Sequence, residues 1–479
     1  MPEITTMSSN HHHDNHDHKA NIMQKVSKSA AIVTGEIANK TTEEVADVTA
    51  EEFIDLFSIA NNEPDFLREK RIIAVRKANS LPLPSLRYGT SIILNIGELN
   101  FTKLQASLRE QNEETNKQNE KKFQIQLYIE NKQFNEIRKQ GVIICTLWEA
   151  LLQPRFQNII QDQFMNTTTI QEKECNKKED IFLHYHQAYM NKTLFIYVPK
   201  NCSPKRALEI ISSIETENIF EHIFIYLDEN AQLTVIEEIS SKEQESIPST
   251  FSYRSAVTEI ILNQNATLNY ISSQSLNNTY YNINTNTARI AQDATMNWFT
   301  VTSGSKFTKQ EIISFLDGKG ARVNNFSLFL ADKQQQFDFA APCYHNAEQT
   351  HTNIIAKGAV KDKSKAVFRG VIHIKENATN ATGYQKEDNL ILDDTAEADA
   401  IPMLYIDNND VKCSHGATIG QVDKEKLFYM QSRGISEEKA QQIIIEGFFD
   451  SLLKQIGTEL ISEEIIERIK KTIHNKLNN

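Results

Sequence analysis

The sequence predicts a mainly β protein, in which a parallel β-helix is flanked by helical regions at its N-terminal and C-terminal ends. A short pattern recurs beyond Thr193: polar residues, an alanine, and then alternating apolar positions. The alanines, spaced 35, 28 and 27 residues apart, are Ala231, Ala266, Ala294 and, in a looser copy, Ala321. A repeat of about 20–50 residues is typical of a solenoid, and strands with no helical pattern between them favour a β-helix.

Helical spacing replaces the strand pattern on both sides of the repeats. Early in the chain, Phe53, Leu56 and Phe57 recur on one helical face, and an apolar stripe follows Ser436. Ser436 with two glutamates behind it is also a suitable helix start. We therefore expect four segments: a disordered His-rich tail at 1–40, a helical and mixed region at 41–190, the β-helix core at 191–417 and a helical region at 418–479.

The N-terminal tail is polar and rich in histidine. Its histidines alternate with acidic residues and lie at His11, His12, His13, His16 and His18. Such a tract can bind a divalent metal. A segment with so few apolar residues cannot bury enough surface to order itself, so a disordered tail is the favoured interpretation.

Composition and charge disfavour several classes of function. The chain has 479 residues and a formal net charge of −12, which disfavours a broad nucleic-acid surface and docking on anionic lipid. No apolar run reaches the roughly 18 residues of a membrane helix, and the N-terminus carries no secretory signal. The five cysteines are scattered without a CxxC pair, which fits a reducing compartment. We expect a cytoplasmic protein that binds neither nucleic acid nor membrane.

Cys413 and His415 are the candidate site residues. They lie two positions apart in a predicted strand, so both side chains point to one face, with Lys412 and Ser414 on the other. A soft thiolate beside an imidazole suits iron or zinc. The alternative is a packed strand end, in which Cys413 is a small buried hydrophobe.

A candidate partner surface follows the strand region. Phe428, Tyr429 and Arg433 are of the residue types that anchor interfaces, although the same aromatic pair can equally seal the open end of a solenoid. Gly447, next to Phe448 in a helical stripe, is unfavourable by about 1 kcal/mol relative to alanine. It therefore suggests close approach by a neighbouring backbone.

Other polar residues give weaker signals. His345 and His351 near Cys343 are a possible second metal site, but two histidines and one cysteine on different turns are a weak pattern. His184 and His186 share a face of a predicted strand and are interpreted as structural. Trp298 follows the third repeat and is interpreted as a core or groove residue.

The residues at 411–421, followed by Leu427-Phe-Tyr429 and the segment 432–435, resemble the C-terminal signature of the SufB/SufD proteins of the Suf iron–sulfur cluster assembly system. Further matches lie at 357–360, 366–370 and 395–406, and the resemblance covers roughly residues 63 to 453. It implies a right-handed β-helix that pairs with a SufB-type partner. It also implies a C-terminal helical region that docks the SufC ATPase.

The residues of this signature resemble those of the SufD branch. Cys413-Ser-His415-Gly is SufD-type, whereas SufB-type scaffolds usually read Glu-His-Glu-Ala there and carry a cysteine where Ala396 stands. The resemblance implies a transient iron–sulfur cluster shared with a partner at Cys413 and His415. It places the partner-binding residues Phe428, Tyr429, Arg433, Gly447 and Phe448 in the docking region. Whether a flavin binds to the assembled complex cannot be read from the sequence.

These observations predict a non-catalytic assembly subunit. The sequence has no G-x-x-x-x-G-K-[ST] phosphate loop, so a partner must supply the ATP hydrolysis. One alternative is a SufB-like scaffold acting as a homodimer. Another is a carbohydrate-active β-helix enzyme, which needs clustered carboxylates where the repeats offer Asn, Thr and Ser.

Overall fold

The computed structural model describes residues 49–61, 63–88, 92–96, 131–167, 175, 179–214, 218–241, 252–460 and 463–478. The predicted tail at 1–40, with its histidine tract, lies outside the described residues. The chain divides into two compact units. The first contains Met1–Leu81, Asn100–Gln124 and Gln187–Tyr189, and the second contains Pro82–Leu99, Ile125–His186 and Met190–Asn479.

Two helices form most of the described part of the first unit, α2 (Ala50–Ala60) and α3 (Asp65–Ser80). Thr49 caps α2 through a capping box, which satisfies backbone N–H groups that the first helical turn leaves without partners. A buried ion pair joins Arg71 of α3 to Glu63 in the segment between the two helices, with N–O distances of 2.8 Å. This pair explains how an arginine is accommodated in the interior.

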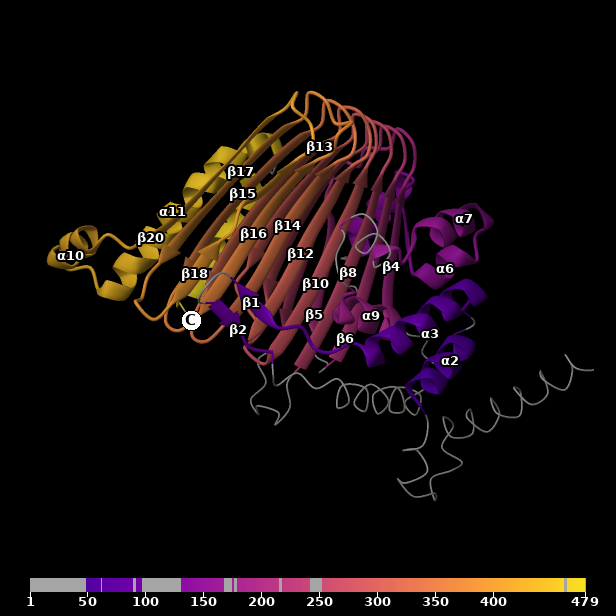
Figure 1. Cartoon of the computed structure of the whole chain (residues 1–479), viewed down its shortest axis with the longest axis horizontal. Coiled ribbons are helices and arrows are strands. Elements are labelled where there is room, and N and C mark those ends of the chain that lie inside the picture. The colour runs from indigo at the N-terminus through magenta and orange to yellow at the C-terminus, as the bar shows by residue number, and fades with distance from the viewer. Residues whose placement is uncertain are drawn as a thin grey trace, which may run out of the picture. The chain divides into compact units, whose positions relative to one another are not determined.

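The second unit contains a β-helix made of two sheets of parallel strands (Figure 1). The first sheet contains β4 (Lys192–Val198), β6 (Asn218–Leu227), β8 (Ser252–Leu262), β10 (Tyr280–Ile290), β12 (Phe307–Leu316), β14 (Gln336–His345) and β16 (Lys365–Ile374). At one end it continues with β3 (Ile143–Cys145), antiparallel to β4, and at the other with β18 (Glu397–Ala400) and β19 (Met403–Ile406). The second sheet contains β5 (Leu208–Ile214), β7 (Gln232–Ser241), β9 (Thr267–Ser275), β11 (Thr295–Thr302), β13 (Arg322–Ala331), β15 (His351–Val360), β17 (Thr382–Ile391) and β20 (Lys412–Gln421).

The other elements precede or follow the coils. An antiparallel hairpin is formed by β1 (Leu86–Tyr88) and β2 (Ile92–Leu94). The helices before or early in the solenoid are α5 (Asn131–Lys139), α6 (Leu147–Leu151), α7 (Pro154–Gln163) and α9 (Ile181–Tyr189). The helices after it are α10 (Lys424–Ser432), α11 (Glu437–Leu460) and α12 (Glu463–Asn478). The predicted mainly β fold, a parallel β-helix with helical regions on both sides, is confirmed.

The alanine repeat marks one corner of the coils. Each repeat alanine is completely buried at the start of a strand of the second sheet. Each is preceded by a residue with positive φ; these residues are Asn230, Asn265, Asp293 and Gly320. Asparagine, aspartate and glycine tolerate that left-handed conformation, and the small alanine lets successive coils stack closely. The spacing seen in the sequence is therefore the length of one coil.

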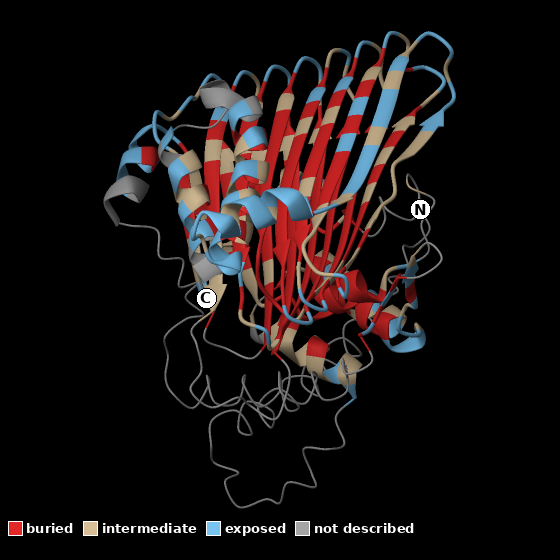
Figure 2. Ribbon diagram, turned by 90° about the vertical axis from the view of Figure 1, so that its left-hand side faces the viewer, coloured by how far each residue is buried: buried red, intermediate tan, exposed pale blue. Residues whose placement is uncertain are grey.

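The inside of the solenoid is packed with side chains from both sheets, and Figure 2 shows the buried residues concentrated along the strands. Trp298 is fully buried, its Nε1 donates to Ser314 Oγ at 3.1 Å, and its ring lies 5.5 Å from that of Tyr270. It is a core residue and not a groove residue. The core is consequently specified by aromatic packing as well as by aliphatic alternation.

Helices α11 and α12 cover the outer face of the second sheet. Ile445, Phe449 and Leu452 of α11 belong to one buried cluster with strand residues of β7 to β15. This contact removes apolar strand surface from water, which stabilises the coils from β7 to β15 and fixes α11 along them. None of the described helices is long and apolar enough to span a lipid bilayer.

Two local predictions differ from the structure. The last strand continues past the expected end at 417 to Gln421, because Ile419 and Gly420 still pair in register with β17. His184 and His186 lie on helix α9 and not on a strand. The apolar residues of α9 surround nearly its whole circumference because the helix is buried, so its sequence carries no clear helical period.

Candidate functional site

Strand β20 forms the last rung of the second sheet. It pairs with β17 on one side, and within the described residues no strand pairs with its other edge. None of its residues is fully buried. The exposed backbone N–H and C=O groups of this edge are therefore available for pairing with another chain.

Cys413 and His415 point to the inner face of the solenoid at this rung. Their in-register neighbours on β17 are Gly383 and Gln385, respectively. Gln385 is completely buried, and a Cβ on Gly383 would lie 2.9 Å from the Cys413 sulfur, so both neighbours face inward. The strand therefore places the thiol and the imidazole side by side, because they occupy adjacent inward-facing positions of one strand.

The environments of the two groups differ. The Cys413 side chain is half-buried and packs against the main core cluster. Burial raises the pKa of the Cys413 thiol, and the backbone N–H of Ser414 partly opposes this shift. His415 is exposed, so its ring nitrogens are accessible to a metal or a partner. Cys413 is thus packed against the core and also faces inward beside His415, so the sequence alternatives do not exclude each other.

The chain supplies no complete metal site of its own within the described residues, where no group of three or more His, Cys, Asp or Glu side chains is placed to hold an ion. Cys413 and His415 are two donors, and the position of Ala396, which is almost buried at the start of β18, adds no ligand. Iron and zinc usually take four protein donors in tetrahedral sites. Two donors are therefore fewer than such a site requires.

The second metal site suggested by His345, His351 and Cys343 is not formed. Both ring nitrogens of His345 are occupied, Nδ1 by the Thr350 hydroxyl at 2.7 Å and Nε2 by the Thr352 hydroxyl at 2.9 Å. Burial lowers the pKa of His345 to about 3 and raises that of Cys343 to about 12. These groups are neutral and hydrogen-bonded or packed in the core, which is the structural role of a buried histidine and a buried thiol.

His186 of α9 belongs to a buried polar chain that the sequence did not reveal. His186 bonds to Ser255 Oγ at 3.0 Å and to Nδ1 of His222 at 3.2 Å, and His222 Nε2 lies 3.1 Å from the Glu259 carboxylate. Backbone N–H groups of residues 165–167 also donate to Glu259. This network joins α9 to the outer face of β6 and β8, so the structural interpretation of His186 agrees with its contacts.

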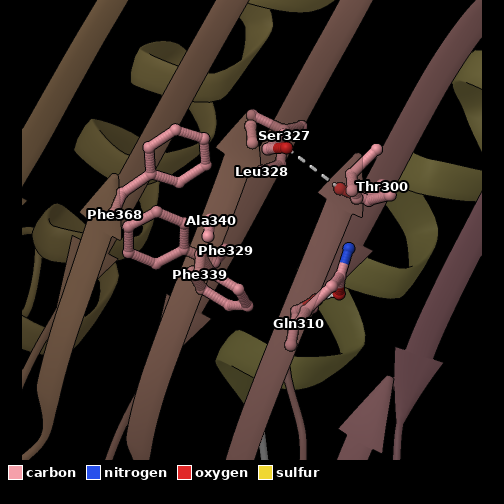
Figure 3. Close-up of a pocket in the computed structure, with 11 residues that line it drawn as sticks. Thr300, Gln310, Ser327, Leu328, Phe329, Phe339, Ala340 and Phe368 are labelled. Atoms are coloured by element: carbon pink, nitrogen blue, oxygen red, sulfur yellow. Dashed lines mark hydrogen bonds between the residues drawn. The ribbon is translucent and has the colours of Figure 1, made fainter. Parts of the chain in front are cut away.

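Small cavities lie inside the solenoid. One of about 10 Å³ is lined by Thr300, Gln310 and Ser327 on one side and by phenylalanines on the other (Figure 3). Another of about 30 Å³ lies in the first coils beside Glu221, Glu237 and Arg254. Each has room for little more than one or two water molecules, so neither is large enough for a small-molecule ligand.

Helix α10 carries exposed aromatic residues. None of its residues is buried; Phe428 is 71% exposed and Tyr429 is 59% exposed. The Arg433 guanidinium lies over the Tyr429 ring, 5.3 Å from its centroid. The possibility that this aromatic pair is a core element is therefore wrong for this chain. Large exposed apolar residues on one short helix are typical of a surface that a partner covers.

Gly447 is exposed on α11. Outside its own helix, no atom of the described residues lies within 4 Å of a Cβ built on it, so the predicted close neighbour is not among the described residues of this chain. The next residue, Phe448, contacts its own chain, with the Lys357 ammonium 4.4 Å from its ring centroid. The helix places its glycine on the solvent side and its apolar stripe on the sheet.

Together the fold and the site define a β-helical protein that presents two soft metal donors at the edge of its last coil. Residues 210–448 match the family described as the SufBD core domain of SUF system FeS cluster assembly. The chain belongs to the SufBD family of iron–sulfur cluster assembly proteins. The family resemblance seen at residues 411–421 is confirmed at this level.

Curated relatives agree with the family assignment. An iron–sulfur cluster assembly SufBD family protein of Staphylococcus saprophyticus is 35% identical over 271 residues, which cover 56% of this chain and 57% of the relative. A SufBD family protein of Staphylococcus epidermidis and the iron–sulfur cluster assembly protein SufB of Bacillus subtilis are each 34% identical over the same length and with the same coverage. The chain thus spans little more than half the length of these relatives.

Proposed function

We propose that this chain is a SufD-like, non-catalytic subunit of a cytoplasmic complex that assembles iron–sulfur clusters. It pairs with a SufB-type β-helix along β20, and a SufC-type ATPase docks on its C-terminal helices. The iron–sulfur cluster is the cargo of this complex, held transiently between the chain and its SufB-type partner.

The proposal rests on one observation: Cys413 and His415 lie beside a strand edge that no strand of the described residues pairs with. Strand addition along β20 would continue the second sheet into the partner. The same step would bring the partner's side chains up to Cys413 and His415, which lie on the inner face of that rung. An incomplete ligand set beside a pairing edge suits a site that forms only in the complex.

The runner-up is a SufB-like scaffold acting as a homodimer, and the relative named SufB favours it. Ala396 opposes it, because this position in SufB-type chains carries a cysteine and here offers only a methyl group. Anaerobic reconstitution of the isolated chain with iron and sulfide separates the two. One cluster per chain without partners supports the scaffold, whereas a cluster that requires the partner supports the SufD-like role.

We expect His415→Ala to reduce cluster loading when the chain is co-expressed with its partners. Loss of one metal–ligand bond should lower the bound iron and sulfide about tenfold or more, without lowering the amount of complex recovered. The measurement is the iron and sulfide content of the purified complex with its visible absorption. His351→Ala is the control, because His351 is also exposed on the second sheet but bonds Thr382. Equal loading in wild type and His415→Ala would refute the role of His415.

The ATPase surface is assigned to α10 because its aromatic residues are exposed and lie next to the covering helix α11. Phe428, Tyr429 and Arg433 form the proposed contact. Gly447 and Phe448, on α11, belong to the same docking region. A short helix with no buried residue gains little stability from its own chain, so its aromatic side chains are best explained by a partner.

We expect the double variant Phe428→Ala/Tyr429→Ala to bind the ATPase more weakly by roughly 30-fold or more, since two interface aromatics commonly contribute about 2 kcal/mol or more together. The thermal midpoint of the chain should stay unchanged, because both rings are exposed. Calorimetric titration of the ATPase subunit into each protein measures the affinity. Leu152→Ala, at an 82% exposed residue beyond α6, is the matched control. If the double variant binds the ATPase with wild-type affinity, the docking site lies elsewhere on the chain.

A further inference from the structure

The two ends of the β-helix are covered differently. At the first coil the chain covers its own core, because Ile137 of α5 and Val142 before β3 belong to the main core cluster and are buried. Strands β18 and β20 lie at the other end (Figure 1). Within the described residues, no strand pairs with the free edge of either sheet there. The last coil is therefore open where the first is closed.

The mouth of the last coil exposes side chains that continue the core. Ile406 on β19 and Ile419 on β20 are 43% and 46% exposed. Ile406 is in register with Ile374, which is completely buried in the main core cluster. Ile419 is in register with the buried Asn389, which shares a face of β17 with the core residue Ile391. Both isoleucines thus face inward, and a further coil would bury them.

A ladder of rings on the outer face of the first sheet ends at the same rung. Phe315, Tyr344, His373 and Tyr405 are in register on β12, β14, β16 and β19. The centroids of successive rings lie 5.1, 5.8 and 5.8 Å apart. Phe315 and Tyr344 are buried, whereas Tyr405 is 53% exposed. A partner strand beside β19 would place its side chains against the open side of the Tyr405 ring.

The geometry of this end indicates what can cover it. The two sheets of a coil lie about 10 Å apart, so a single strand or helix covers one edge and leaves the other open. The end coil of another β-helix covers both edges and the apolar mouth between them. A second copy of this chain would bring another net charge of −12, which disfavours self-association. A different β-helical chain therefore fits this end best.

We propose that the first-sheet edge is the apolar half of the subunit interface, where Tyr405 and Ile406 anchor the end coil of the SufB-type partner. The inference rests on the proposed function for the identity of the partner, and it adds the β19 edge to the β20 edge. The partner presents an aromatic ring or a guanidinium to Tyr405 and apolar side chains to Ile406 and Ile419. Tyrosine is among the residues that most often dominate the binding energy of an interface.

The test titrates the SufB-type subunit into the full-length chain in a calorimeter. We expect Tyr405→Ala and Ile406→Ala each to weaken binding about tenfold or more. Tyr405→Phe should keep the wild-type affinity, because the hydroxyl donates to Met403 Sδ of its own chain at 3.7 Å and the ring makes the proposed contact. The thermal midpoint of each variant checks that it is folded. Ile406→Lys, which places a charge at the mouth, replaces any alanine variant that does not fold.

Tyr384→Ala is the matched control. Tyr384 is also an exposed tyrosine, but it lies on the outer face of the second sheet one coil before the open end. We expect this variant to bind the partner as the wild type does. Equal weakening by Tyr384→Ala and Tyr405→Ala would show that loss of any exposed ring reduces the affinity, and it would overturn the proposal.

A variant of the β20 edge distinguishes this inference from the proposed pairing along β20. Lys412 and Val422 donate their backbone N–H groups toward β17, so the N–H of Ala417 points to the free edge. Ala417→Pro removes that donor without removing a bond to β17. If Ala417→Pro weakens binding and Tyr405→Ala does not, the β20 pairing stands and the present inference fails. If Tyr405→Ala alone weakens binding, the inference stands and the β20 pairing fails.

Light scattering of the isolated chain tests the choice of partner. We expect a monomer at the concentrations used for the titration. A dimer that Tyr405→Ala dissociates would assign this surface to a second copy of the chain and overturn the assignment to a SufB-type partner.

Discussion

The Arg254→Met protein is expected to unfold roughly 4–7 °C below the wild type, since removal of one partner from a buried ion pair is unfavourable by about 3–5 kcal/mol and each kcal/mol shifts the midpoint of so large a unit by little more than about 1 °C. Arg254 is 1% exposed inside the first coils of the solenoid. Its Nε lies 2.8 Å from the Glu221 carboxylate, and its terminal nitrogens reach Glu237 at 3.6 Å and Asn282 at 3.0 Å. Methionine fills the space but leaves two inward-facing carboxyl groups without a cation.

The pH dependence of this deficit provides an internal check. Burial raises the pKa of Glu221, but the charge of Arg254 outweighs burial and the net pKa is lowered. Burial also raises the pKa of Glu237, and there it outweighs Arg254. Without the guanidinium, both pKa values rise, and both carboxyls take up protons as the pH falls. The difference in thermal midpoint should therefore be smaller at pH 5 than at pH 8.

The control for Arg254 is an exposed ion pair of similar length. Lys365 and Glu397 lie on adjacent strands with an N–O distance of 2.8 Å, and both side chains are about one-third exposed. Lys365→Met should lower the midpoint by about 1 °C at most, because solvent-exposed pairs contribute about 0–1 kcal/mol. Scanning calorimetry of the two variants measures both effects. Equal shifts would show that burial does not determine the contribution of Arg254.

Much of the fold could be predicted from the chain because a solenoid repeats its local constraints. The left-handed residue before each repeat alanine demands Asn, Asp or Gly, so Asn230 and Asn265 reveal the coil length directly. Helix α9 could not be recognised, because burial around its circumference removes the helical period that exposes other helices in sequence. A helical period appears in a sequence when one face of the helix is buried and the other meets water, and α9 has almost no face in water.

The candidate site was predictable only in part. Cys413 and His415 are adjacent inward positions of one strand, and alternation along that strand is enough to place them together. Gln385 lies 30 residues before His415 in the chain and meets it only through the register of β17 with β20. No local pattern encodes that register, since loops of different lengths separate the coils. The in-register neighbour of His415 therefore required coordinates, while His415 itself did not.

The Glu387→Gln protein is expected to be more stable than the wild type at pH 8, by an amount that disappears at pH 4 to 5. Glu387 is 1% exposed, and its Oε1 accepts the Gly370 N–H at 2.9 Å. Its Oε2 has no partner within the described residues. Burial raises the pKa of this carboxyl from 4.5 to about 8, against the backbone N–H groups of Gly370 and Ile401. Few other side chains in the solenoid are held so far from their ordinary protonation.

The direction of this pH dependence follows from the number of protons bound to the folded and to the unfolded chain. Below pH 4.5 Glu387 is protonated in both the folded and the unfolded chain. Between pH 4.5 and about 8 the unfolded chain loses this proton while the folded chain keeps it, so the free energy of unfolding falls as the pH rises. The loss is on the order of 3 kcal/mol at pH 7. Glutamine accepts the same backbone N–H and does not titrate, so the variant escapes this loss.

Thermal midpoints of wild type and Glu387→Gln, measured from pH 4.5 to pH 8.5, test the prediction. The two curves should coincide at the acid end and separate steadily up to pH 8, after which the difference should stay constant. Glu348→Gln is the control, because Glu348 is exposed on a turn and paired with Lys319 at 2.7 Å; its curve should follow the wild type throughout. A constant offset between wild type and Glu387→Gln at every pH would mean that Glu387 does not retain its proton in the folded chain.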